Sequence, residues 1–445
     1  MIIIEVIKTY EFRKFFRFNL RRDIKEMRPK KAKHRQAQPQ EGTLLGHTGK
    51  RAIKVEDEAK HIFVCGTTGS GKTVALSNFI KRAIEKDYPA LIIDGKGSTG
   101  EDSMLDVVNK LNKNGKKKVY TINLTDPNNS DNYNPFQNAS PTIIKDMIIN
   151  MTDWSEEHYK LNAERYIQRI TQLLEIGDIK PSFKKIIKCI PTEKFLELSM
   201  HLLTKEKITK EQHIANIDLA NTSGKVSQSS SARFSTIAES ELGQIFSDQG
   251  IDILTAIKEN AIIVFVLNPL IYPEVSPAFG RLVLIDAKKA VSKLFGSQIK
   301  RTFFIMDEIN VYASPVLTDL VNKSRSANIT CILATQSLSD LDQASTEAFK
   351  EQIIENCNNY ILLRQNSGVN AEHWANILGT RATMEVSYQL EQKGLDTGTT
   401  GFGSAKRVRE YLYHPDEIKT LRIGQGIYLS RDTNHHSRIK IHKPF

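Results

Sequence analysis

The residues Gly66–Thr73 read GTTGSGKT, and their types and spacing point to phosphate chemistry. They satisfy the phosphate-binding pattern G-x4-G-K followed by Ser or Thr. The glycines let backbone amides wrap around phosphate oxygens, and the start of the following helix adds a favourable dipole. Lys72 can reach the β- and γ-phosphates of a nucleotide, and Thr73 can ligate Mg²⁺. The predicted nucleotide-binding residues are Gly66, Thr67, Thr68, Gly69, Ser70, Gly71, Lys72 and Thr73.

A second segment, TFFIMDE, supplies the two carboxylates that such a loop needs. An apolar strand would deliver Asp307 to its carboxyl end, where its carboxylate can hold Mg²⁺. Glu308 beside it can polarise an attacking water as a general base. An Asp-Glu pair at this place can also cap a helix, so the loop upstream is what favours hydrolysis. The sequence has no NKxD motif, which argues against a GTPase.

A third segment, ILATQSLSDL, places Gln336 at the end of the next expected strand. A side-chain amide there can sense the γ-phosphate and couple its loss to movement. A polar residue that merely ends a strand is the alternative interpretation. The order of the loop, the Asp-Glu strand and the Gln strand is typical of additional-strand P-loop ATPases that work as rings.

Apolar segments that alternate with helical stretches predict the frame for these residues. The expected strands are HIFVCG, PALIIDG and KVYTINL, followed by 260–269, 301–310, 329–337, 356–365 and 424–432. This alternation predicts an α/β fold with a mostly parallel central sheet covered on both faces. Within residues 141–254 the apolar spacing is helical instead. The Ser-rich segment at 223–235 is expected to be a loop that re-enters the sheet domain.

The expected domain organisation follows from that change of pattern. Residues 1–44 form a basic arm and linker, 45–140 the first part of the nucleotide-binding domain, 141–254 an inserted all-α domain, and 255–445 the second part. This insertion accounts for the long separation between Lys72 and Asp307.

The composition sets wider limits on the function. A chain of 445 residues with 40% hydrophobic and 25% charged residues is an ordinary globular protein of two to three domains. The net charge of +11 suits a polyanionic partner, although a lysine-rich solvated surface produces the same value. The four cysteines form no CxxC pair, which favours a reducing compartment. Cys65 and Cys331 lie in apolar segments and are expected in the core.

The sequence contains no signal peptide and no run of about 18 apolar residues that would span a bilayer. The N-terminal segment FRKFFRFNLRR could lie on an anionic membrane or a partner helix, or form a solvated helix. The expected location is the cytoplasm, with a peripheral position on the inner face of the cell membrane as a further option.

Several segments together resemble one known family. HIFVCGTTGSGKT, LIIDGKGS, INLTDPNNSDNYNPF, FFIMDEIN and KSRSANITCILATQSLSDL follow one another as in type IV secretion coupling proteins. These are conjugative DNA-transfer ATPases of the TraG/TraD/VirD4 type. The similarity runs from about Leu44 to the end, including RVREYLYHPDEIKTLRIGQGIYL. NYNPF (residues 132–136) and ATQS discriminate better than the phosphate-binding loop does.

The resemblance implies a RecA-like P-loop ATPase that assembles as a homo-hexamer around a DNA channel, with ATP and Mg²⁺ as cofactors. It implies that Arg325, in NKSRSANI, acts in trans on the neighbouring subunit's nucleotide, while Arg364 and Arg381 are less favoured. Asp94 and Lys96 match a family motif whose role the resemblance leaves open. The family's N-terminal transmembrane pair has no counterpart here. This implies either a soluble variant that docks on a separate membrane subunit or one that acts away from a secretion channel.

The function implied is a motor that brings a relaxase-bound single strand of DNA, or a protein substrate, to a type IV secretion apparatus. Its partners would be relaxosome and channel proteins, with residues 141–254 as the specificity element. Phosphate contacts could come from the lysines of 110–120 or 180–189, although both segments also suit a solvated face. One alternative is an FtsK/HerA-type translocase of double-stranded DNA. Another is a nucleotide-switched adaptor without motor activity, against which Glu308 argues.

Overall fold

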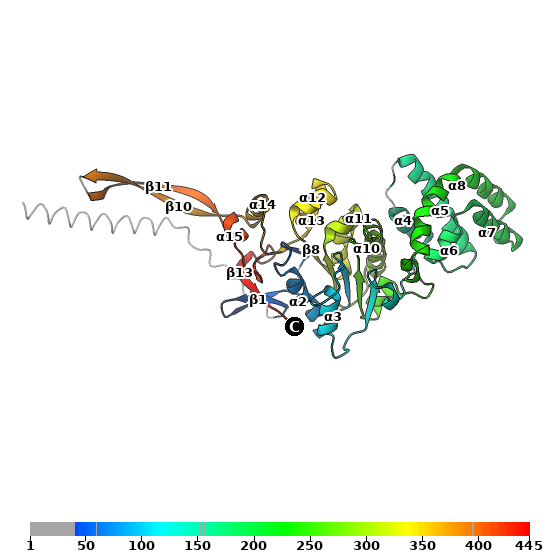
Figure 1. Cartoon of the computed structure of the whole chain (residues 1–445), viewed down its shortest axis with the longest axis horizontal. Coiled ribbons are helices and arrows are strands. Elements are labelled where there is room, and N and C mark those ends of the chain that lie inside the picture. Colours follow the sequence, from blue (N-terminus) through cyan, green and yellow to red (C-terminus); the bar gives the residue numbers. More distant parts are fainter. Residues whose placement is uncertain (1–40, 59, 152–153, 155, 394–395) are drawn as a thin grey trace, which may run out of the picture. The chain divides into compact units, whose positions relative to one another are not determined.

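A sheet of 11 strands organises the larger part of the chain (Figure 1). The computed structural model describes residues 41–58, 60–151, 154, 156–393 and 396–445. The expected N-terminal arm lies outside the described residues up to residue 40, and Thr43 already begins the first strand. The strands are β1 (Thr43–Thr48), β2 (Arg51–Val55), β3 (Ile62–Cys65), β4 (Ala90–Asp94), β5 (Val119–Asn123), β6 (Ile262–Val266), β7 (Thr302–Asp307), β8 (Ile329–Thr335), β9 (Asn359–Leu362), β12 (Gln425–Ser430) and β13 (His435–Ile441).

The order of these strands is β2-β1-β13-β12-β9-β3-β8-β7-β4-β6-β5. All neighbours from β9 to β5 run parallel, whereas β12, β13, β1 and β2 extend the sheet antiparallel. The predicted mostly parallel α/β sheet is therefore confirmed. Parallel strands are joined by crossovers, so their carboxyl ends lie at one shared edge. The ends of β3, β4, β7 and β8 all meet at that edge.

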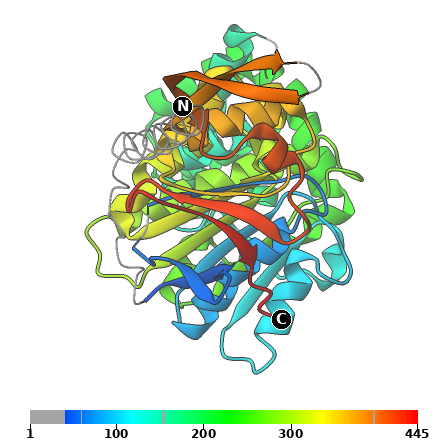
Figure 2. The ribbon, with the colours of Figure 1, turned by 90° about the vertical axis from the view of Figure 1, so that its left-hand side faces the viewer.

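Helices cover both faces of this sheet (Figure 2). Every residue of β3, β4, β6, β7, β8 and β9 is buried, as strands covered on both faces require. One face packs in a single apolar cluster with α2 (Lys72–Glu85) and α3 (Met104–Leu111). The other face carries α10 (Val275–Leu294), α11 (Pro315–Ser324), α12 (Leu338–Ala344) and α13 (Glu347–Asn356) (Figure 1), and α9 (Ile253–Lys258) packs against α10.

The described residues between 141 and 239 form helices and their connections, without a strand. The helices are α4 (Pro141–Asn150), α5 (Glu157–Ile176), α6 (Phe183–Lys188), α7 (Thr192–Thr204) and α8 (Lys210–Glu239). Short 3₁₀ turns lie elsewhere in the chain: η1 (Pro127–Asn129), η2 (Glu241–Gln244), η3 (Ile309–Tyr312) and η4 (Arg325–Ala327).

The prediction of a loop at residues 223–235 is wrong, because this segment belongs to helix α8. The helix begins with a capping box in which Thr209 and Gln212 satisfy each other's backbone amides. A Cβ at Gly224 would lie 2.3 Å from Thr192 Cγ2, so the two helices α8 and α7 approach closely at this glycine. Phe234 is buried further along α8. Gly224 therefore allows close helix packing, and serine is only mildly unfavourable within a helix.

The chain leaves the sheet domain and returns to it through one short paired segment. The amide of Tyr133 donates to Ile245 O (2.8 Å) and that of Asn134 to Ile251 O (2.9 Å). The phenol of Tyr133 donates to Asp286 Oδ2 on α10 (2.9 Å). The NYNPF segment thus forms the exit of the helical insertion and is tied to the helix beneath it.

A buried lysine completes this junction. Lys289 Nζ lies 2.9 Å from Asp252 Oδ2 and 2.8 Å from Asp286 Oδ1, and all three side chains are fully buried. The same ammonium donates to Pro135 O (2.8 Å) and Gln137 O (2.6 Å). The Lys289 ammonium therefore binds groups of three segments: the chain that leads into the helical insertion, the chain that returns from it, and α10.

Residues Gln365–Thr420 form a second compact unit. It contains α14 (Gly368–Leu378), α15 (Pro415–Lys419) and a long hairpin of β10 (Thr380–Lys393) and β11 (Asp396–Tyr411). The strand pairing runs from Thr380 opposite Tyr411 to Lys393 opposite Asp396. The sequence pattern does not separate this unit from the second part of the nucleotide-binding domain, and the predicted domain boundaries remain predictions.

We expect Lys289→Met to lower the unfolding free energy by about 3–5 kcal/mol, because two fully buried carboxylates would lose their counter-charge. The neighbouring Lys288 serves as the matched control, since it pairs with Asp319 at the surface and is 39% exposed. Lys288→Met should cost less than about 1 kcal/mol. Urea unfolding measures the unfolding free energy of both variants. Equal values for Lys289→Met and Lys288→Met would contradict a stabilising role of the buried Lys289 ion pairs.

Candidate nucleotide-binding site

The loop between β3 and α2 has the backbone of a phosphate cradle. Gly69 (φ 73°) and Gly71 (φ 111°) adopt left-handed conformations that favour glycine. A Cβ at Gly66 would lie 2.5 Å from Leu363 Cβ, so a larger residue would not fit there. Ser70 supports the turn through Oγ, which donates to Thr67 O (2.6 Å). Lys72 is the first residue of α2, so the helix dipole points at the loop.

The two predicted carboxylates stand at the carboxyl end of β7. Asp307 is its last residue and lies opposite Asp94 of β4 in the strand register. Asp307 Oδ1 accepts the amide of Glu308 (2.9 Å), and Tyr312 donates its phenol to Asp307 O (3.0 Å). Glu308 has φ 48°, an uncommon conformation for a non-glycine residue that often marks functional sites. The backbone turn aims its carboxylate back toward the loop.

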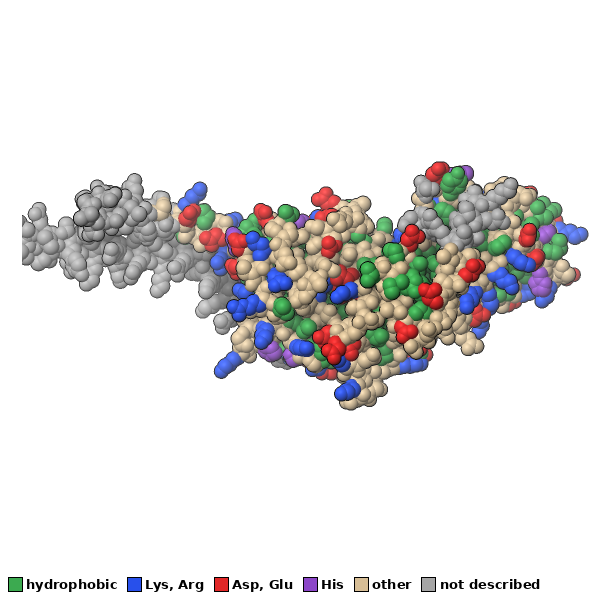
Figure 3. Space-filling model, viewed as in Figure 1, with side chains coloured by type: hydrophobic (Ala, Val, Ile, Leu, Met, Phe, Trp, Pro, Cys, Tyr) green, Lys and Arg blue, Asp and Glu red, His purple; other side chains and the backbone are tan. Residues whose placement is uncertain are grey.

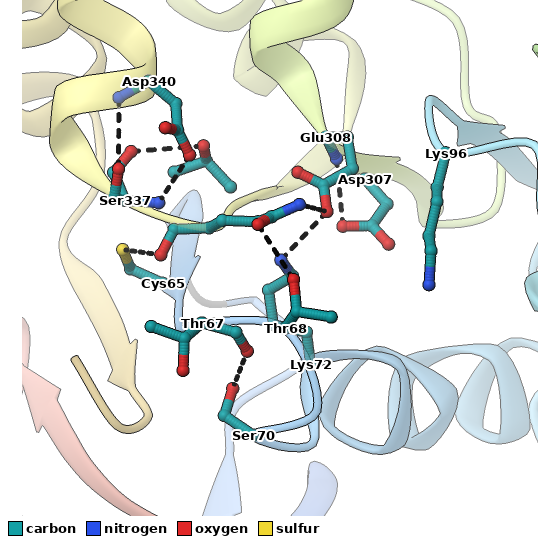
Figure 4. A network of polar contacts seen from close by, with 12 residues as sticks. Cys65, Thr67, Thr68, Ser70, Lys72, Lys96, Asp307, Glu308, Ser337 and Asp340 are labelled. Carbon is teal, nitrogen blue, oxygen red and sulfur yellow. Dashed lines mark hydrogen bonds and ion pairs between the residues drawn. The ribbon is translucent and has the colours of Figure 1, made fainter. Parts of the chain in front are cut away.

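A polar network joins the ends of three strands (Figure 4). Lys72 Nζ donates to Glu308 Oε1 (3.0 Å), and Gln336 Nε2 donates to the same oxygen (3.0 Å). Thr68 Oγ1 in turn donates to Gln336 Oε1 (3.0 Å). The structure thus brings together four residues that the sequence places in three distant segments.

Three carboxylates are crowded at this edge, and the pKa values of two of them, Asp307 and Asp94, are raised. Burial, followed by the charge of Glu308, raises the pKa of Asp307 to about 7. Burial raises the pKa of Asp94 to about 6. The backbone amides of Lys96 and Gly97 donate to Asp94 Oδ1 and partly offset this rise, because they stabilise the charged carboxylate. A cation placed here would therefore relieve an unfavourable concentration of negative charge.

The donor set suits a hard divalent cation. Asp94 Oδ2 and Glu308 Oε2 are buried and accept no hydrogen bond from the described residues. Among those residues, no group of three or more His, Cys, Asp or Glu could hold a metal by itself. Mg²⁺ needs only one or two carboxylates when phosphates and water complete its shell. Asp307 and Thr73 fit that role, and Thr73 lines the same pocket.

The pocket between these groups has a volume of about 390 Å³. The residues that line it are Thr67, Thr68, Gly69, Gly71, Lys72, Thr73, Val74, Asp94, Lys96, Ser98, Glu101, Asp102, Ser103, Met104, Asp307, Glu308, Gln336 and Ile423. Sequence reasoning missed Ile423, which lies far along the chain and whose surroundings contain no recognisable spacing. Lys96 also faces the pocket (Figure 4), so the motif formed by Asp94 and Lys96 lies at the candidate nucleotide site.

The three candidate arginines occupy different places in the chain. Arg325 is exposed in η4, just before β8, whereas Gln336 follows the other end of that strand. Seven residues of strand separate them by roughly 20 Å, so Arg325 does not reach the pocket of its own chain. Arg364 follows β9, and its carbonyl accepts the amide of Thr67 (3.0 Å). Arg381 belongs to the second compact unit.

Some lysines of the two lysine-rich segments form ion pairs with nearby carboxylates. Lys117 pairs with Asp87, Lys118 with Glu259, and Lys185 with Asp248. On the face drawn in Figure 3, Lys and Arg side chains are interspersed with Asp and Glu.

Two further expectations concern the core and the membrane. Cys65 and Cys331 are fully buried, which confirms their prediction as core residues, and the cysteines are free thiols. Across the part of the chain that the structure describes, no helix has both the length and the apolar character needed to cross a bilayer.

Comparison with known proteins adds to this geometry. Residues 47–442 match the model of a family described as the type IV secretion-system coupling protein DNA-binding domain. An uncharacterized protein of Mycoplasma pneumoniae is 30% identical over 119 residues, which are 27% of this chain and 77% of that relative.

Solved structures share the fold at low sequence identity. The unbound conjugative coupling protein TrwBdeltaN70 superposes with a TM-score of 0.66 at 15% identity, covering 92% of this chain and 90% of that one. VirB4 of Thermoanaerobacter pseudethanolicus gives a TM-score of 0.58 at 14% identity, covering 91% and 97%. At these identities the likeness shows a common fold.

We expect Asp307→Asn to raise the unfolding free energy at pH 8 by roughly 2–4 kcal/mol with divalent cations chelated, because the buried charge disappears. The pKa of Asp307 is raised in the folded state, so the wild-type protein loses stability as the pH rises from near 4 through about 7. The gain from asparagine should therefore be small near pH 4 and grow up to pH 8.

Urea unfolding in EDTA at several pH values measures this gain. Asp218→Asn, at an exposed position of α8, is the control and should change stability by less than about 0.5 kcal/mol. A loss of stability for Asp307→Asn at pH 8 would show that Asp307 is a structural anion.

Proposed function

This chain belongs to the family of type IV secretion-system coupling protein DNA-binding domains, and from that premise we propose that it is an ATP-hydrolysing motor that moves DNA. The resemblance found in the sequence is confirmed by the family match. The observation that carries the proposal is the network of Lys72, Glu308 and Gln336, in which a phosphate-binding cation, a candidate base and an amide sensor share one carboxylate oxygen.

ATP and Mg²⁺ are the ligands that this site would take. Solved structures of TrwB contain ADP with Mg²⁺ and non-hydrolysable analogues of ATP and GTP. In this chain the amides of Gly66–Thr73 and the ammonium of Lys72 would hold the phosphates. Thr73 and Asp307 would hold Mg²⁺, which when bound neutralises charge on the reacting phosphates.

The shared oxygen suggests how hydrolysis is gated. Lys72 Nζ and Gln336 Nε2 both donate to Glu308 Oε1, and both are donors that a terminal phosphate at the loop would attract. Once a phosphate takes these donors, Glu308 Oε1 is free to accept a proton from a water molecule. Gln336 would report the loss of the phosphate, since its amide would return to Glu308 and its carbonyl already accepts Thr68.

A ring explains the position of Arg325. Arg325 is exposed and lies before the amino end of β8, whereas the nucleotide pocket of the same chain lies at the carboxyl ends of the strands. Phosphoryl transfer often requires an arginine to stabilise transition-state charge, supplied in trans by a neighbour. We place Arg325 in the pocket of the next subunit of a homo-hexamer, with DNA in the central channel.

The finer assignments follow the family. The substrate would be single-stranded DNA bound to a relaxase, recruited with relaxosome proteins and passed to the secretion channel. The helical insertion would select the substrate. A separate membrane subunit would hold the protein at the inner face of the cell membrane.

A translocase of double-stranded DNA uses the same nucleotide site, so the preferred strand type separates the two motors. A nucleotide-switched adaptor needs no general base, and the placement of Glu308 beside Lys72 disfavours it.

We expect ATP hydrolysis by the purified protein to rise with DNA and Glu308→Gln to lower kcat at least about 100-fold while ATP still binds, because the general base is lost. Glu347→Gln, at an exposed position of α13, controls for the loss of a carboxylate and should leave hydrolysis unchanged. Stimulation by single strands alone supports the conjugative motor, and stimulation by duplex supports the translocase. ATP binding without turnover under any of these conditions would refute the motor.

Mixing two inactive variants tests the trans arginine. Arg325→Ala and Glu308→Gln proteins should each lack hydrolysis, because each spoils one side of every interface. Random mixing in equal amounts should restore activity at about one interface in four, where an intact Glu308 faces an intact Arg325. A mixture as inactive as its components would place the required arginine elsewhere.

A further inference from the structure

An apolar side chain projects into the nucleotide pocket from a segment that the sequence does not connect with it. Ile423 lies in the turn between α15 and β12, is 73% exposed, and lines the same pocket as Lys72 and Glu308. A single exposed isoleucine is ordinary on a protein surface. Its place inside the pocket is what calls for an explanation.

The turn that carries Ile423 is held firmly against the phosphate-binding loop. The amide of Gly424 donates to Ser70 O (3.1 Å), and its carbonyl accepts the amide of Ile441 of β13 (2.8 Å). Gly424 has φ 73°, and its Cα lies 3.6 Å from where a Cβ of Gly71 would stand. The close approach of two glycines therefore fixes the backbone beside Ile423 at the loop while the side chain stays exposed.

The strand order places Ile423 and the catalytic network on opposite sides of the loop. β12, which follows Ile423, lies two strands from β3 in one direction. β7, which carries Asp307, lies two strands from β3 in the other direction. A nucleotide whose terminal phosphate faces Glu308 would therefore direct its nucleoside end toward Ile423.

From this geometry we infer that Ile423 forms an apolar platform for the base of the bound nucleotide. The inference rests on the proposed ATP-binding function and extends it to the base. A branched aliphatic side chain fits against the flat face of a purine by apolar contact and dispersion. It has no hydrogen-bonding group, so it would support adenine and guanine equally.

The affinities of ATP, GTP and inorganic tripolyphosphate, measured in Mg²⁺ by calorimetry, test this role. Ile423→Ala should weaken ATP and GTP about five- to tenfold through the lost apolar contact. Tripolyphosphate has no base, so its affinity should change less than about twofold. Ile423→Phe should retain or improve ATP binding, since an aromatic ring can stack on the base.

Leu270→Ala is the matched control, because Leu270 is also apolar, is 92% exposed and lies outside the pocket lining. It should change no affinity. Equal weakening of ATP and tripolyphosphate by Ile423→Ala, or weakening of neither, would overturn the platform while leaving nucleotide binding intact. A wild-type protein that binds none of the three anions would instead overturn the proposed function, and this inference with it.

Discussion

The contact between Lys72 Nζ and Glu308 Oε1 lies at the centre of the candidate site, and it depends on the arrangement of the sheet. It can form because β3 and β7 are parallel, run in the same sheet and end at the same edge. β8 lies between them and brings Gln336 to the same oxygen. A slip of one residue in any of these strands would turn its terminal side chain to the other face of the sheet. The long buried strands and the helices on both faces keep that register.

The site is maintained at the expense of stability. Asp94 and Asp307 are buried side by side at this edge, and burial raises the pKa of both. Glu308 also occupies an uncommon backbone conformation. Such costs persist only when the surrounding structure over-determines the geometry. Here the fully buried strands β4 and β7 provide that support, and a bound cation with phosphates would offset much of the charge.

The helical insertion is joined to this frame by charge as well as by backbone pairing. Lys289 satisfies two carboxylates and two carbonyls at the point where the chain leaves and returns. A buried ion pair is sensitive to the loss of either partner, because the remaining charge is left uncompensated. The insertion is therefore tied to α10 at this junction. α10 in turn packs beneath the sheet that carries the nucleotide site.

The sequence by itself determined the parallel sheet, the phosphate-binding loop, the Asp-Glu strand and the Gln strand, because each rests on local spacing within one segment. It misjudged the Ser-rich part of α8, where the packing of Gly224 against Thr192 supports a helix. The hairpin unit of residues 365–420 and the position of Ile423 carried no local signal. Only the tertiary structure decided that Ile423 faces the pocket and that Arg325 lies away from it, because strand order and close approach join residues far apart in the chain.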